Sequence, residues 1–94
     1  MKYIKTYELF DNYLDYKKDD YVYVTGYPNF DNLAKISLAN NTSKKNWDYL
    51  MCAREINTGK YEYSYIDESD IDRKLTPDEI NEYEARKDID KYNL

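Results

Sequence analysis

Apolar and polar residues alternate with a two-residue period through the middle of the chain. The segments "YVYV", "AKISL", "WDYLMCAREI" and "KYEYSYI" are rich in aromatic and β-branched residues, and each is followed by residues typical of turns. This combination is the pattern of half-buried β-strands. It predicts four strands, at about residues 21–25, 34–39, 47–56 and 60–66.

The alternation also assigns side chains to the faces of the predicted sheet. In "AKISL", the inner face receives Ala34, Ile36 and Leu38. The third strand is apolar on both faces, so we expect both to be covered: Trp47, Tyr49, Met51 and Ala53 on one, Leu50, Cys52 and Ile56 on the other. "NTG" (57–59) fits a three-residue hairpin loop with Gly59 in the left-handed conformation.

Two segments carry signals of helices. Near the N-terminus, an apolar stripe at helical spacing predicts a helix at about residues 3–14: Tyr3, Tyr7, Phe10 and Leu14. Near the C-terminus, Thr76 is an N-cap and Glu79 completes a capping box, which predicts a helix at about residues 77–90. The apolar face of this second helix is thin, and we expect it to dock on the surface through Ile80, Tyr83 and Ile89.

The order of elements is a helix, four short strands and a helix. A chain of 94 residues has room for one hydrophobic core, so we predict a single domain over residues 1–94. Short strands joined by uneven loops favour a small, strongly bent antiparallel sheet or partly open barrel. The predicted fold class is therefore α+β, with the sheet flanked by N-terminal and C-terminal helices.

The composition narrows the chemistry that the chain can perform. It has 13 tyrosines, which bury large apolar area and keep a polar tip, and it has no histidine. Histidine is the usual acid–base group near neutral pH and the commonest metal ligand, so we predict a protein that is not an enzyme and that uses no cofactor or metal. A single cysteine, Cys52, and the lack of a long apolar run or a signal peptide favour the cytoplasm and no membrane association.

Charge is distributed unevenly along the sequence. The whole chain has a net charge of -5, and residues 61–94 hold 5 basic against 11 acidic residues, a balance of -6. A negative field repels nucleic-acid phosphates and favours basic partners. We therefore expect a protein partner with a basic surface, such as a nucleic-acid-processing effector, rather than direct nucleic-acid binding.

Two parts of the sequence resemble known groups of proteins. "KKDDYVYV" (17–24) is similar to the opening strand of SH3-like small barrels, in which a Lys-x-Gly-Asp-Tyr-Val pattern leads from a turn into the first strand. One position departs from that pattern, because Asp19 stands where the family has its turn glycine. "MKYIKTYE" and "RKLTPDEINEYEARKDIDKYNL" (73–94) resemble the ends of small uncharacterised proteins of bacteriophages and other mobile elements. The resemblance implies an SH3-like barrel with terminal helices and implies no reaction.

The predicted partner-binding surface combines a row of tyrosines with an acidic cluster: Tyr61, Tyr63, Tyr65, Asp67, Glu68, Asp70 and Asp72. The alternative for the tyrosines is packing against the N-terminal helix, and the alternative for the acids is a solvated turn. A calcium loop of the EF-hand type fails, because counting from Asp67 puts Asp72 where the glycine belongs. An irregular divalent-cation site and a catalytic carboxylate pair are further alternatives, and the pair lacks a scaffold that forms a cleft.

The functional hypothesis is a non-enzymatic acidic interaction protein of phage type. Its most specific form is an anti-CRISPR-like inhibitor of a host defence nuclease, whose carboxylates occupy a basic channel built for nucleic acid. One alternative is an SH3-like module that binds nucleic acid or a nucleotide directly through Lys17, Lys18, Lys35, Lys44 and Lys45. Another alternative is a structural phage component.

Overall fold

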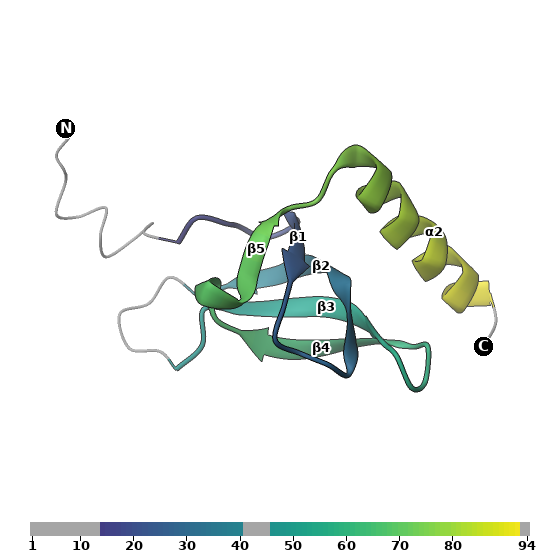
Figure 1. Cartoon of the computed structure of the whole chain (residues 1–94), viewed down its shortest axis with the longest axis horizontal. Coiled ribbons are helices and arrows are strands. Elements are labelled where there is room, and N and C mark those ends of the chain that lie inside the picture. The colour runs from purple at the N-terminus through teal and green to yellow at the C-terminus, as the bar shows by residue number, and fades with distance from the viewer. Residues whose placement is uncertain (1–13, 41–45, 93–94) are drawn as a thin grey trace, which may run out of the picture.

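The computed structural model describes residues 14–40 and 46–92, with side chains described as far as residue 89. Its elements are β1 (Tyr21–Val24), β2 (Phe30–Ala39), β3 (Tyr49–Glu55), β4 (Tyr61–Ile66), the 3-10 turn η1 (Glu68–Asp70), β5 (Ile71–Lys74) and α2 (Pro77–Tyr92). The strands form one antiparallel sheet in the order β4-β3-β2-β1-β5. The α+β class and the bent antiparallel sheet are thus confirmed (Figure 1).

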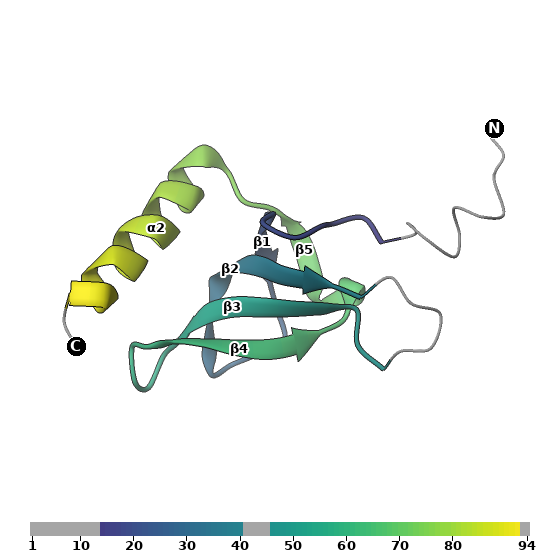
Figure 2. The same cartoon turned by 180° about the vertical axis from the view of Figure 1, so that it is seen from behind.

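The sheet curls so that β1 and β5 run steeply across β3 and β4 (Figures 1 and 2). β2 is ten residues long and pairs with β1 on one side and with β3 on the other. Its register with β3 shifts between Ile36 and Leu38, and an irregularity of this kind bends a strand and increases its twist. The sheet is not closed: its edge strands, β4 and β5, follow one another in the chain through η1 but do not pair with each other.

The hydrophobic core lies on the concave, inner face of the sheet. Eight buried residues form it: Val22, Val24, Ala34, Ile36, Tyr49, Met51, Ala53 and Ile66. They come from the first four strands at alternating positions, as strand geometry requires. The tyrosine-rich composition is reflected directly in this core, where Tyr49 is its largest side chain.

The helix α2 begins at the predicted capping box. The Thr76 hydroxyl accepts a hydrogen bond from the Glu79 N–H at 3.3 Å, and a Glu79 carboxylate oxygen accepts one from the Thr76 N–H at 2.9 Å. Glu82 and Arg86, four positions apart on α2, form an ion pair. In the described part of the chain, no helix is both long and apolar enough to cross a membrane.

One aromatic side chain attaches α2 to the outer face of the sheet. Tyr83 is 1% exposed and makes edge-to-face contacts with Tyr21 and Tyr61, at ring-centroid distances of 5.6 and 5.4 Å. Its hydroxyl donates to the Cys52 carbonyl at 3.1 Å. Burial is the main reason that the pKa of Tyr83 is raised far above its usual value. Glu84 accepts a hydrogen bond from the Tyr21 hydroxyl, which strengthens the same contact.

Ion pairs hold α2 at a second point. Asp31 on β2 lies 3.1 Å from Arg86 of α2 and 3.2 Å from Arg54 of β3. One carboxylate therefore bridges the helix and two strands. The helix is docked by few residues, as expected, but Ile89 is exposed and is not among them.

Several expectations about the elements need correction. The sheet has five strands instead of the predicted four, and the additional strand is β5. β2 begins at Phe30, before the predicted start at residue 34. Leu38 lies on the outer face, because the irregularity after Ile36 reverses the alternation and brings Ala39 against the core instead. Ile56 lies beyond β3 and is exposed. The predicted helix over residues 3–14 falls outside the described residues except for Leu14, which is not helical.

Candidate functional site

The outer face of the sheet carries the predicted tyrosine row. Cross-strand partners share a face, so the register places side chains in rows across β2, β3 and β4. One row is Lys35, Cys52 and Tyr63, and the next is Leu38, Leu50 and Tyr65. The prediction that the three tyrosines of β4 share one face is therefore confirmed.

The three tyrosines nevertheless differ in their surroundings. Tyr61 is half-buried under Tyr83 of α2, whereas Tyr63 is 62% exposed and Tyr65 is 58% exposed. The Trp47 ring packs on Tyr65 at a centroid distance of 4.7 Å. Together with Leu38, these side chains form a large apolar surface that is exposed to water, on the part of the outer face that α2 does not cover.

Glu68 of the acidic cluster is committed to a structural contact. It accepts a hydrogen bond of 2.6 Å from the hydroxyl of the buried Tyr49 and a second one of 3.0 Å from the Asp15 N–H. The Tyr49 hydroxyl in turn accepts a hydrogen bond from the Tyr16 N–H. Burial, and next the bond to Glu68, raise the pKa of Tyr49 well above its usual value. This network ties residues 15 and 16 to the end of the sheet.

Asp70 is engaged in a similar way. It accepts a hydrogen bond of 2.9 Å from the Tyr27 hydroxyl and one of 3.0 Å from the Asp67 N–H. Burial, followed by the bond to Asp70, raises the pKa of Tyr27 to about 12. Two of the four clustered acids thus serve as acceptors for tyrosine hydroxyls that are distant in sequence.

Asp67 and Asp72 are the members of the cluster that face water. The Asp72 side chain is 62% exposed, and the ion pair that it forms with the neighbouring Arg73 is long, at 3.9 Å. Within residues 14–40 and 46–92, no group of three or more acids and cysteines converges in a way that could hold a metal ion. Asp67 therefore lies just beyond the end of β4, two residues after Tyr65, whereas Asp72 lies on β5.

A second feature lies beside Tyr63, where a pocket of about 130 Å³ opens between α2 and the outer face. We call it the lysine pocket, because three of its lining residues are Lys18, Lys35 and Lys87. The lysines predicted for the nucleic-acid-binding alternative include Lys18 and Lys35 but not Lys87. Lys44 and Lys45 lie outside the described residues. Lys87 follows Tyr83 by four positions on α2, and this helical spacing is the signal that could have found it.

The chain matches no family model, and no curated protein or solved structure is significantly similar to it. The interpretation of the outer face therefore depends on its own geometry and chemistry.

Proposed function

We propose that this protein is a non-enzymatic interaction protein that binds a basic protein partner. The binding surface is formed by Leu38, Trp47, Tyr63, Tyr65 and Asp67, here called the aromatic–acidic surface. The observation that carries the proposal is the exposure of Tyr63 and Tyr65 on a sheet face of which α2 covers only one part.

The chemistry of these side chains suits an interface. Tyrosine and tryptophan supply large, rigid contact area and are enriched among the residues that dominate binding energy. The contact between Trp47 and Tyr65 already holds both rings in place, which lowers the entropy that binding would cost. Asp67, two residues after Tyr65, and the net charge of -5 favour a partner of opposite charge and speed its approach.

The proposal includes an SH3-like barrel as the scaffold. Two observations support it. The last strand, β5, pairs with the first, β1, which is the neighbour relation expected of a partly open barrel. Asp19, which stands where the resembled pattern has glycine, has a φ of 76°, the left-handed conformation that a glycine would adopt there without strain.

The most specific form of the proposal is an inhibitor of a host defence nuclease that acts in the cytosol of a phage-infected cell. It is supported by the acidic charge of residues 61–94 and by the resemblance of the chain ends to phage proteins. In this form, the aromatic–acidic surface competes with nucleic acid for a basic channel of the partner.

The test is capture from a bacterial lysate on the immobilised full-length chain, followed by identification of the bound protein and titration of that protein. Tyr65→Ser should weaken binding of the identified partner about thirtyfold, the effect of losing an anchor worth about 2 kcal/mol. Asp67→Asn should slow association and reduce its dependence on salt. Asp88→Asn, an exposed acid on α2, is the matched control and should leave binding unchanged.

Two results would contradict the proposal at different levels. Equal affinity of the partner for the unchanged chain, Tyr65→Ser and Asp67→Asn would remove the aromatic–acidic surface from it. A partner that binds nucleic acid equally well with and without saturating amounts of this chain would remove the inhibitor form and leave the interaction.

A further inference from the structure

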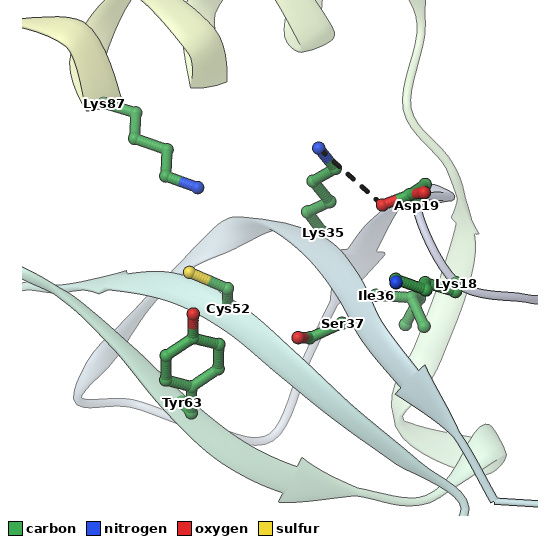
Figure 3. A pocket seen from close by; sticks show the side chains of 8 residues that line it. All are labelled: Lys18, Asp19, Lys35, Ile36, Ser37, Cys52, Tyr63 and Lys87. Carbon is green, nitrogen blue, oxygen red and sulfur yellow. Dashed lines mark ion pairs between the residues drawn. The ribbon is translucent and has the colours of Figure 1, made fainter.

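The lysine pocket is built from segments that are distant in sequence. Lys18 comes from the turn before β1, Lys35 and Ser37 from β2, Tyr63 from β4 and Lys87 from α2. Figure 3 shows Lys87 extending from the helix toward the sheet and Lys35 extending from the sheet toward the helix. The docking of α2 through Tyr83 is what brings these groups around one space.

The pocket is locally basic on an acidic protein. Its lining contains three ammonium groups and a single carboxylate, that of Asp19. Asp19 is largely exposed and lies 4.0 Å from Lys35, so it neutralises the pocket only in part. Glu84, which lies on α2 as Lys87 does, already accepts a hydrogen bond from the Tyr21 hydroxyl.

Aromatic rings position two of the ammonium groups. Lys35 lies 5.2 Å from the centre of the Tyr21 ring, and Lys87 lies 5.9 and 5.7 Å from the centres of the Tyr61 and Tyr83 rings. Contacts of this kind attract a cation to a ring face without consuming its hydrogen-bond donors. Each ammonium group has three N–H donors, so the ion pair that Lys35 makes with Asp19 still leaves donors for a ligand.

We propose that the lysine pocket binds the phosphate group of a nucleotide, with the base of that nucleotide stacked on the exposed Tyr63 ring. A volume of about 130 Å³ is small beside the roughly 300–1,000 Å³ of pockets that enclose a whole small-molecule ligand, and it suits a compact group such as a phosphate. The base must then lie outside, where the 62% exposed Tyr63 offers an aromatic surface at the rim.

Two sources could supply this chemistry, a free mononucleotide and an oligonucleotide. In either case lysine ammonium groups neutralise the phosphate, and the Ser37 and Tyr63 hydroxyls are additional donors. The proposal goes beyond the binding of a basic protein partner. The two proposals share Tyr63, but this one makes no use of Tyr65 or Asp67, whose variants test the other, so either proposal can fail alone.

The experiment is an NMR titration of the ¹⁵N-labelled full-length chain with four probes. They are inorganic phosphate, adenosine 5′-monophosphate, adenosine and a single-stranded thymidine octanucleotide. Phosphate and the monophosphate should shift the amides of Lys35, Ser37 and Cys52, with the monophosphate binding more tightly, and adenosine should bind at least tenfold more weakly than the monophosphate.

Variants identify the groups that bind. Lys35→Gln and Lys87→Gln should each weaken binding of the monophosphate about tenfold, because each removes one charge-assisted contact. Lys60→Gln, an exposed lysine near the β3–β4 hairpin, is the matched control and should leave the affinity unchanged. The spectra of the free variants establish that they are folded, and Asp67→Asn should bind the monophosphate as the unchanged chain does.

The octanucleotide separates the two sources. If an oligonucleotide is the ligand, it binds more tightly than the monophosphate, and its affinity falls about 20-fold between 50 and 200 mM salt if three phosphates are neutralised. If the octanucleotide binds no better than the monophosphate, a free nucleotide is the ligand. Adenosine binding as tightly as its monophosphate, unchanged affinity in both lysine variants, or no shift at the pocket amides with millimolar phosphate and monophosphate would each overturn the proposal.

Discussion

Alkaline pH should destabilise this protein through its buried tyrosines. Tyr49 and Tyr83 are 0% and 1% exposed, and burial raises the pKa of each far above the usual value of 10.0. In the unfolded chain both hydroxyls ionise near pH 10, whereas in the folded chain they stay protonated. Their contribution to stability is therefore fully present below pH 10 and is lost as the pH rises above it.

The size of the effect follows from the linkage between protonation and folding. One pKa unit corresponds to about 1.4 kcal/mol, so each of the two tyrosines lowers the free energy of unfolding by about 1.4 kcal/mol at pH 11 relative to pH 8. Together they remove about 2.8 kcal/mol, which is a large share of the roughly 5–15 kcal/mol that stabilises a domain.

Tyr83→Phe isolates one of the two contributions. At pH 8 the variant should be less stable by about 1–2 kcal/mol, because the Cys52 carbonyl loses its donor. Between pH 8 and pH 11 the difference from the unchanged chain should shrink by about 1.4 kcal/mol, since a phenylalanine cannot ionise. Ionisation of every other tyrosine and lysine affects both chains alike and cancels in the difference.

The assay is urea unfolding followed by Trp47 fluorescence and far-ultraviolet circular dichroism at pH 8, 9, 10 and 11. Tyr63→Phe is the control, because that ring is 62% exposed and meets water in both states, and its curve should run parallel to that of the unchanged chain. A constant difference between Tyr83→Phe and the unchanged chain from pH 8 to pH 11 would refute the argument from burial.

Three further predictions concern single contacts. Asp19→Val should lower the free energy of unfolding by about 1–2 kcal/mol, because the φ of 76° at this position is strained for a β-branched residue. Asp19→Gly should change the same free energy by less than about 1 kcal/mol, and urea unfolding measures both. Tyr49→Phe should lower the free energy of unfolding by about 1–3 kcal/mol, because Glu68 loses its buried donor; thermal unfolding measures this. Asp67→Asn should change the same free energy by no more than about 0.5 kcal/mol. Hydrogen bonds from the Arg73 guanidinium are the main reason that the pKa of Glu79 is lowered to about 2. The stabilisation that Glu79 gives to α2 is therefore present above pH 4.5, the usual pKa of the group, and is lost as the pH falls toward 2. Glu79→Gln should have a weaker helix signal at 222 nm than the unchanged chain at pH 6, and a persistent difference below pH 2 would contradict this.

The sequence predicted those features whose causes lie within a few residues. The capping box of α2 needs only Thr76 and Glu79, and the hairpin loop needs Gly59, which has the expected positive φ of 76°. Strand alternation depends on neighbouring positions, so it correctly placed Tyr49, Met51 and Ala53 on the core face. It was wrong for Trp47, which precedes β3 and packs on Tyr65 of the outer face.

The sequence did not reveal β5. "IDRK" (71–74) has one apolar residue, so it shows no alternation, and it is a strand because its backbone pairs with β1, about fifty residues earlier. The exposure of Leu38 was missed for a related reason. An irregular register between two strands is decided by how both strands pair, and it reverses the side-chain pattern of one of them.

The candidate sites show the same division. Periodicity alone put Tyr61, Tyr63 and Tyr65 on one face, but only the position of Tyr83 decided that the first is covered and the other two are exposed. The acidic cluster was visible in the sequence, whereas the hydroxyls bonded to Glu68 and Asp70 come from residues 19 and 43 positions away. The lysine pocket likewise joins four separate elements. Local sequence sets the period of the backbone and the cap of a helix, but burial, exposure and hydrogen-bond partners depend on which distant surfaces meet when the chain packs.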